Sequence, residues 1–336
     1  MERKHRFLEY LRLVRVHSAA FTAVVIIIGC LIMMKQYNLL HLSLLFIIGI
    51  LSHIFIFVLN EYADMRVDEK SQYLKEKPLV SGAIPKNHAL FIALLACVLV
   101  YALTIIFFQS LFSLLFLSLA LLSGGIYDIW GKKILGSDLL IAGGCFFLCL
   151  FGASTVSTDF TNLVYIISFS IFVYIVFSNA VVGGLKDVDH DYLSGAKTTA
   201  TRMGVKVEDR KLLSTKKFTA FSYSVELIYI GLIVLAGFQP ELSLWRSDEH
   251  IIHIVVILLV VVTFAALYKF WHPSDFDRSR LFRIFGIHII SAYYLGPIIL
   301  LPLIGIEMTL ILLILPLFWM SIFNLVLYGK PMQPEI

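Results

Sequence analysis

Residues 45–68 read LFIIGILSHIFIFVLNEYADMRVD, an apolar run that passes directly into a charged segment. The charged segment places Asn60, Asp64 and Asp68 at intervals of four residues. Residues four apart lie on one face of an α-helix, about 6 Å apart along its axis. The spacing therefore predicts a helix whose end carries three oxygen ligands in one stripe. An ordinary solvated helix end would show the same spacing, so the motif alone does not identify a site.

Apolar runs of similar length recur along the whole chain. Of its 336 residues, 59% are hydrophobic and only 15% are charged, and the mean hydropathy is +0.89. A soluble domain has about 25% charged residues, and a helix needs about 20 apolar residues to cross the hydrocarbon core of a bilayer. The chain is therefore predicted to be an all-α, polytopic membrane protein. Ten spans are predicted, at residues 14–34, 39–60, 88–108, 110–127, 139–157, 162–183, 217–238, 250–271, 281–304 and 306–328.

Positive charge is distributed unevenly between successive loops. If the ten spans alternate across the membrane, all 27 lysines and arginines except Lys35 and Arg246 fall on the side of the N-terminus. Cytoplasmic loops of membrane proteins carry an excess of Lys and Arg. The N-terminus and the charged loops 61–87 and 184–216 are therefore expected in the cytoplasm. The net charge of +4 follows from this topology and from anionic lipid headgroups, so it gives no reason to expect nucleic-acid binding.

A second acidic motif follows the sixth predicted span. Residues 178–204 read SNAVVGGLKDVDHDYLSGAKTTATRMG, in which Asp187 and Asp191 again lie four residues apart. The span count places both motifs on the same side of the membrane. Two carboxylates about 4 Å apart repel by about 4 kcal/mol at an effective dielectric constant of about 20, so several at one opening require a cation. Mg²⁺, which bridges carboxylates and phosphate oxygens, is the cation that this pattern favours.

Basic residues near the two motifs favour a polyphosphate ligand. Four aspartates and a diphosphate bring a charge of about −7, of which two Mg²⁺ ions neutralise about four and nearby lysines the rest. Lys77 follows the first motif, and Lys132 and Lys133 follow the fourth span. Each lysine alone has an ordinary explanation as a positive-inside anchor. Only the combination of acids and bases at one membrane face favours a site.

These motifs resemble a known family. The pattern NxxxDxxxD at 60–68, the sequence KPLVSG at 77–82, and DxxxD at 187–191 followed by GAKTTATRMG at 195–204 are similar to the UbiA superfamily of intramembrane prenyltransferases. The resemblance covers residues from about 10 to about 300. It implies a bundle of nine or ten transmembrane helices around a central cavity, forming one domain over 1–336. Loops 61–87 and 184–216 would form its active-site cap.

The resemblance also implies roles for individual residues. Two Mg²⁺ ions would hold a prenyl diphosphate donor between the two aspartate motifs. The four aspartates would be essential for catalysis. The metal-binding set would be Asn60, Asp64, Asp68, Asp187 and Asp191; the diphosphate would contact Lys77, Tyr127 and Lys132 or Lys133. Two departures stand out. The family often has an aromatic-Ser-Pro sequence around the tyrosine, where this chain reads YDIWGKK, and it usually has nine spans, so segment 306–328 is extra.

The acceptor is less well specified. Arg15 lies at the start of the first span and is a candidate for binding an anionic acceptor, although positive-inside anchoring also explains it. Asn179, two turns before Asp187, is a second candidate, and a helix-packing amide is an equally good interpretation. An aromatic quinone precursor and a glycerol phosphate lipid both fit a nucleophile near the cytoplasmic surface.

The predicted activity is Mg²⁺-dependent transfer of a prenyl group to such an acceptor inside the membrane, with release of diphosphate. The alternative is a polytopic transporter of an anionic or lipid substrate. Transporters place ionisable residues near the middle of the bilayer, whereas almost every charge here lies at a predicted membrane face. A phosphotransferase reading of the second motif fails because the required Asp-Gly and Ala-Arg segment is missing upstream. A calcium loop fails because Tyr192 stands where that loop needs Gly.

Overall fold

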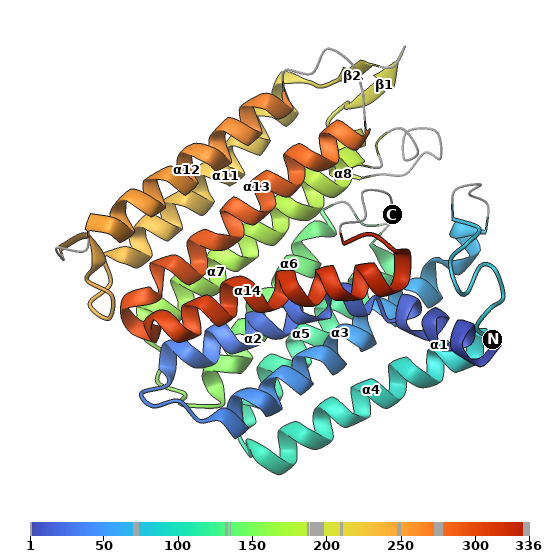
Figure 1. The fold of residues 1–336 in the computed structure, drawn as a ribbon, viewed down its shortest axis with the longest axis horizontal. Coiled ribbons are helices and arrows are strands. Elements are labelled where there is room, and N and C mark those ends of the chain that lie inside the picture. The colour runs from blue at the N-terminus through green and yellow to red at the C-terminus, as the bar shows by residue number, and fades with distance from the viewer. Residues whose placement is uncertain are drawn as a thin grey trace. The chain divides into compact units, whose positions relative to one another are not determined.

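The computed structural model is built almost entirely of α-helices (Figure 1). It describes residues 2–69, 74–131, 134, 136–186, 188, 198–208, 211–246, 250–271 and 278–331. The chain divides into two compact units, which are described separately. Unit 1 comprises Met1–Ile129, Phe147–Asp159 and Ile311–Gln333, and unit 2 comprises Trp130–Phe146, Phe160–Leu310 and Pro334–Ile336.

Unit 1 contains most of the N-terminal helices. In Figure 1 α3 lies between α2 and α4, and both neighbours pack along it. The unit also contains the second half of α6 and the greater part of α14. Its elements are α1 (Glu2–Leu13), η1 (Val16–Ser18), α2 (Ala19–Met33), α3 (Leu39–Asp68), α4 (Lys86–Phe107), α5 (Leu111–Trp130), α6 (Asp138–Ser154) and α14 (Leu301–Tyr328).

The helix α3 is longer than the apolar run that predicted it. It has 30 residues, which gives a length of about 45 Å, and the hydrocarbon core is about 30 Å thick. The predicted span ended at residue 60 because the apolar residues end there, but the helix continues for two more turns. The first acidic motif therefore lies on the polar extension of a membrane-crossing helix, as the four-residue spacing predicted.

Two glycines allow α2 and α6 to cross with their backbones in contact. A Cβ atom at Gly29 would collide with the carbonyl oxygen of Cys149, and one at Gly152 would collide with that of Ile26. Small residues permit this close approach between membrane helices, where van der Waals packing replaces hydrophobic burial as the driving force. The crossing fixes α2 against the second half of α6 within unit 1.

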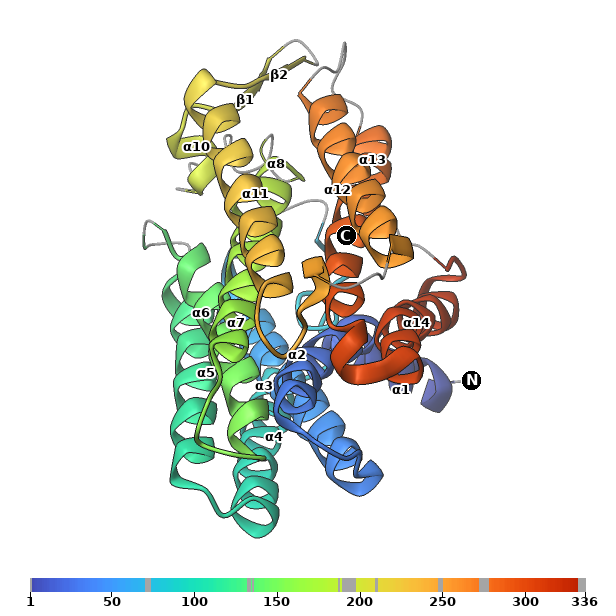
Figure 2. The same ribbon diagram turned by 90° about the vertical axis from the view of Figure 1, so that its left-hand side faces the viewer.

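Unit 2 contains two prominent helix pairs. Figure 2 shows α11 beside α7, and α12 beside α13, and both pairs pack along their lengths. A short antiparallel hairpin, in which Val207 faces Leu212, precedes α11 and is a small departure from the all-α prediction. The elements are α7 (Asn162–Val176), η2 (Phe177–Gly183), α8 (Gly184–Lys186), α10 (Thr199–Arg202), β1 (Lys206–Glu208), β2 (Lys211–Leu213), α11 (Lys216–Gly237), η3 (Leu244–Arg246), α12 (His250–Phe270) and α13 (Arg278–Ile299).

All ten predicted spans correspond to helices, but they differ in length. Within the described ranges, nine helices are long and apolar enough to cross a membrane. The shorter one is α6, with 17 residues. The extra segment predicted at 306–328 belongs to α14, whose path breaks at Gly305, where φ is 72°. This last helix is itself a candidate span, so the prediction of nine or ten transmembrane helices agrees with the structure.

Candidate active site

The first acidic motif occupies the C-terminal turns of α3. Asn60 and Asp64 are partly buried, and Asp68, the last residue of the helix, is 5% exposed. The next residue, Glu69, still donates its backbone N–H to the carbonyl oxygen of Met65, at 3.0 Å. Helical hydrogen bonding thus runs through the whole motif and keeps its three polar side chains on successive turns.

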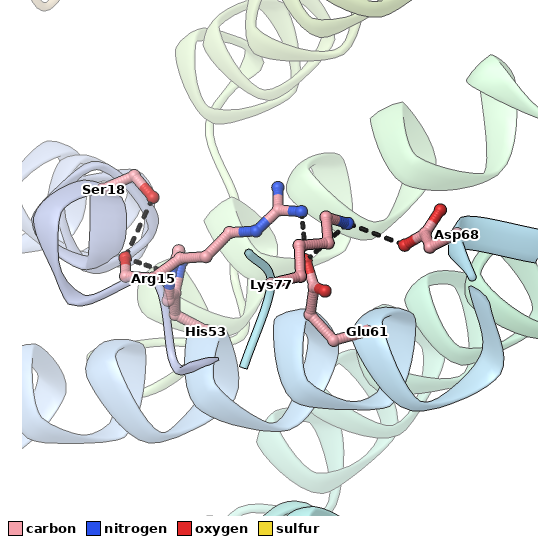
Figure 3. A network of polar contacts seen from close by, with 6 residues as sticks. All are labelled: Arg15, Ser18, His53, Glu61, Asp68 and Lys77. Carbon is pink, nitrogen blue, oxygen red and sulfur yellow. Dashed lines mark hydrogen bonds and ion pairs between the residues drawn. The ribbon is translucent and has the colours of Figure 1, made fainter. Parts of the chain in front are cut away.

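Lys77 lies against the end of this motif (Figure 3). Its ammonium group donates to Oδ2 of Asp68 at 2.8 Å and to Oε1 of Glu61 at 3.1 Å. The lysine comes from the KPLVSG sequence, which folds into tight turns after α3. The structure therefore brings together Asp68, predicted to bind metal, and Lys77, predicted to bind diphosphate, in one ion pair.

A small hydrophobic cluster anchors the segment that carries Lys77. Leu79 and Ile84 are buried against Leu13, Val58 and Ala89. Backbone bonds close the turns, with Ser81 N–H donating to the carbonyl oxygen of Lys77 at 2.9 Å. Burial of a leucine or isoleucine side chain contributes about 1.5–3 kcal/mol, so these contacts hold the lysine in place without constraining its charged end.

Arg15 extends the ion pair into a chain of four charged groups, Arg15–Glu61–Lys77–Asp68, here called the α3 charge chain. Its Nη2 donates to Oε1 of Glu61, the same oxygen that binds Lys77. Glu61 is 5% exposed, and a buried carboxylate needs such partners because desolvation of an unpaired charge is costly. Sequence reasoning missed Glu61. The available signal was its place directly after Asn60, in a chain where Asp and Glu are few.

The backbone at Arg15 adopts a left-handed conformation, with φ 45° and ψ 46°. For a residue with a side chain this costs about 1–3 kcal/mol and requires support from its surroundings. Its carbonyl oxygen accepts hydrogen bonds from Ser18 Oγ at 3.1 Å and from His53 Nε2 at 3.2 Å (Figure 3). Since a carbonyl only accepts, Nε2 of His53 carries a proton. These contacts between the start of the chain and α3 direct Arg15 toward Glu61.

The other predicted site residues are less fully described. Tyr127 is partly buried near the C-terminal end of α5. Lys132, Lys133, Asp187 and Asp191 lie outside the described residues. Their predicted roles therefore stay predictions.

The approach to the second motif is a π-helix, η2, which contains Asn179. Its amide nitrogen donates to the carbonyl oxygen of Ile175 at 3.3 Å. A π-helix has i→i+5 bonds, so the α-helical spacing that linked Asn179 with Asp187 does not apply across this segment. Such segments often occur at functional sites, and the apolar pattern of residues 162–183 gave no indication of one.

The oxygen donors of the first motif have the right chemistry for a magnesium ion. Two carboxylates and an amide suit this hard cation, and the ammonium group of Lys77 on Asp68 demonstrates that the position attracts positive charge. Within the described part of the chain, no three His, Cys, Asp or Glu side chains already form a metal-binding group. Mg²⁺ takes six ligands, so further oxygen ligands such as water or phosphate would complete its coordination.

Comparison with known proteins agrees with the motifs. The family model described as the UbiA prenyltransferase family matches residues 19–290, most of the chain. The protein belongs to the UbiA prenyltransferase family. The 4-hydroxybenzoate octaprenyltransferase of Pseudomonas fluorescens (strain Pf0-1) is 24% identical over 239 residues, which cover 68% of this chain and 69% of that protein. Membership in the UbiA family makes the protein a prenyltransferase, as predicted, rather than a transporter.

Solved structures of UbiA homologues share the fold. A homologue from Aeropyrum pernix K1 superposes with a TM-score of 0.64 at 15% identity, over 85% of this chain and 98% of that one. A homologue from Archaeoglobus fulgidus, bound to GPP and Mg²⁺, gives 0.62 at 17% identity, over 87% and 99%. A digeranylgeranylglyceryl phosphate synthase structure gives 0.62 at 18%, over 86% and 97%. The predicted resemblance and the all-α, multi-pass membrane fold are thus confirmed.

Proposed function

We propose that this UbiA-family protein transfers a prenyl group from an isoprenoid diphosphate to a small acceptor within the membrane and releases diphosphate. The α3 charge chain is the observation that carries the proposal. It joins two buried carboxylates to two basic side chains beside the NxxxDxxxD motif. Such alternating charge suits a metal-bound polyphosphate, because the acidic side chains would bind the metal and the basic side chains would bind the phosphate.

Asn60, Asp64 and Asp68, together with Asp187 and Asp191, are proposed to hold two Mg²⁺ ions. The bound ions would neutralise charge that develops on the departing diphosphate. Lys77 would turn from Asp68 toward a diphosphate oxygen when a metal ion takes over the carboxylate. Its position on a well-anchored turn supports this role, since only the flexible end of the side chain needs to move. Tyr127, Lys132 and Lys133 are proposed as further diphosphate ligands.

The transfer itself breaks the allylic C–O bond of the donor and forms a bond between that carbon and the acceptor, which loses a proton. An allylic cation formed on the way reacts with water, so the reaction benefits from an apolar environment. Apolar helices long enough to cross a membrane supply that environment. Aromatic faces near the cation would each stabilise it by about 0.5–2 kcal/mol.

The proposed acceptor is an aromatic quinone precursor or a glycerol phosphate lipid, with Arg15 and Asn179 as its ligands. Both classes carry an anionic group that a guanidinium can bind. Arg15 is one-third exposed, and its guanidinium also lies 5.3 Å from the ring centroid of Phe57. The relatives named for 4-hydroxybenzoate and for digeranylgeranylglyceryl phosphate support these two classes.

The proposal includes an orientation and an arrangement of the chain. The N-terminus and the loops 61–87 and 184–216 would face the cytoplasm, and the two loops would cap one active site in a single membrane domain over residues 1–336. The segregation of Lys and Arg between alternate loops supports this orientation.

The test is prenyl transfer by the purified protein in lipid vesicles. Isotope-labelled geranyl diphosphate and longer donors would be offered with aromatic and glycerol phosphate acceptors, with Mg²⁺ or with EDTA. We expect a labelled adduct and free diphosphate only with Mg²⁺, restored when Mg²⁺ is added back. An adduct that forms equally well in EDTA would contradict metal dependence. Uptake of label into vesicles without any adduct would contradict the proposed transfer.

A further inference from the structure

A fourth carboxyl group belongs to the neighbourhood of the first motif. Asp128 on α5 is 6% exposed, receives a hydrogen bond from the Asn60 side chain, and lies close enough to Asp64 for the two charges to interact. Its Oδ2 is buried and has no hydrogen-bond partner among the described residues. Asp128 directly follows Tyr127, at the position where the family resemblance leads one to expect Ser.

Close packing between α3 and α5 explains why Asp128 meets Asn60. One turn before Asp128 is Gly124, and one turn before Asn60 is Ile56. A Cβ atom at Gly124 would lie 3.1 Å from Cγ1 of Ile56, which is tighter than ordinary van der Waals contact. The two helices approach closely where the glycine allows it, and the same pair of faces brings the carboxyl and the amide together one turn later.

The hydrogen bond determines which end of the Asn60 amide is available to a cation. Beside a bound cation the carboxyl of Asp128 would be ionised, and an ionised carboxylate only accepts hydrogen bonds. It would therefore bind the NH₂ group of the amide and leave the carbonyl oxygen Oδ1 of Asn60 facing elsewhere. A cation needs that oxygen and is repelled by the NH₂ group. Without Asp128 the amide would rotate more freely between the two orientations, and part of the population would present the wrong end.

We propose that Asp128 is a positioning residue of the magnesium site. Its carboxylate would orient Asn60, and its Oδ2 would accept a hydrogen bond from a water ligand of the ion. Mg²⁺ usually keeps several water ligands, and outer carboxylates of this kind typically change metal affinity 10- to 100-fold. This inference rests on the proposed function only in placing a metal ion at the first motif. It adds a residue of α5 to a metal site whose first three residues lie on successive turns of α3.

The experiment measures metal binding directly, without substrate. Binding of Mn²⁺, as a probe for Mg²⁺, would be followed by electron paramagnetic resonance on purified wild-type protein, Asp128→Asn and Asp128→Ser. We expect both substitutions to weaken Mn²⁺ binding about tenfold or more. The matched control is Asp159→Asn, an exposed carboxyl within the same unit, which should bind Mn²⁺ like the wild type. Unchanged Mn²⁺ binding in a folded Asp128 variant would overturn the proposal.

A double variant tests whether Asp128 acts through Asn60. Asn60→Ala alone should weaken Mn²⁺ binding. In the double variant with Asp128→Asn, the total loss of affinity should be smaller than the product of the losses in the two single variants. Fully independent effects would overturn the positioning role, and so would failure of both Asp128 variants to fold, because the residue would then be structural. A wild type that binds Mn²⁺ but forms no prenylated product would contradict the proposed function while leaving this test intact.

Discussion

Among the described residues, a buried group of charged side chains in unit 1 and another in unit 2 are built differently. The α3 charge chain in unit 1 has four members, and its basic side chains remain 32% and 17% exposed. In unit 2, His288 on α13 donates from Nε2 to Oε2 of Glu226 on α11, at 3.0 Å. Both of these side chains are at most 4% exposed. The ring of Phe177 stacks on His288 with centroids 4.4 Å apart and encloses the pair further.

The difference separates a cluster that can exchange partners from one that cannot. Arg15 and Lys77 keep access to solvent, so a metal or phosphate can replace one of their contacts. Glu226 and His288 lie in the interior of helices that are long enough to cross a membrane, and each retains one buried polar atom without a partner among the described residues. Glu226 is thus an exception to the expectation that charges lie at the membrane faces. We interpret the α3 charge chain as catalytic and the Glu226–His288 pair as structural.

The largest effect should come from removing a carboxylate of the first motif. Asp64→Ala is expected to reduce the rate of prenyl transfer by about 10³-fold, because a group that stabilises transition-state charge typically contributes a factor of about 10²–10³ and here the metal is lost as well. Product formation by purified protein at saturating Mg²⁺ measures this. Asp187→Ala should have an effect of the same order.

The control for this change is Asp159→Ala, which removes an exposed carboxyl. It should leave prenyl transfer within about twofold of wild type, since surface changes away from a site rarely have larger effects. If Asp64→Ala and Asp159→Ala reduced the rate equally, the loss would be nonspecific and the proposed role of the first acidic motif in prenyl transfer would fail.

A smaller effect is expected at Lys77. Lys77→Met keeps most of the side-chain volume but removes the ammonium group shared by Asp68 and Glu61. We expect the rate to fall about 100-fold, with a raised KM for the prenyl diphosphate, because a charged phosphate contact is lost. Steady-state kinetics with varied donor concentration measure both quantities. Lys77→Arg should recover part of the loss, and an unchanged KM for the donor in Lys77→Met would contradict a role in diphosphate binding.

The sequence predicted the helices and the α3 end of the site because both depend on local patterns. An apolar run of about 20 residues predicts a membrane-crossing helix, and a four-residue spacing of polar residues predicts one polar helix face. Both predictions need only the geometry of a helix. The contributions of Glu61 and Asp128 were not predictable in this way. The contribution of Glu61 depends on how the segment that carries Arg15 packs against α3, and that of Asp128 on which faces of α3 and α5 meet. A single carboxyl in the sequence gives no information about its partner. The π-helix at Phe177–Gly183 was missed for a related reason, since its residues are as apolar as those of a regular span.

The smallest effect on turnover is expected at the Glu226–His288 pair, and it sharpens the contrast with the α3 charge chain. Glu226→Leu alone should lower the free energy of unfolding by about 3–5 kcal/mol, because it leaves a buried partner without its bond. Glu226→Leu combined with His288→Phe should restore most of that stability, since replacing a whole buried pair with apolar residues is often neutral. Thermal unfolding in detergent measures the stability, and prenyl transfer per folded molecule should stay within about threefold of wild type. A folded double variant that has lost prenyl transfer would show that the pair takes part in the reaction, and the two clusters would then share one function.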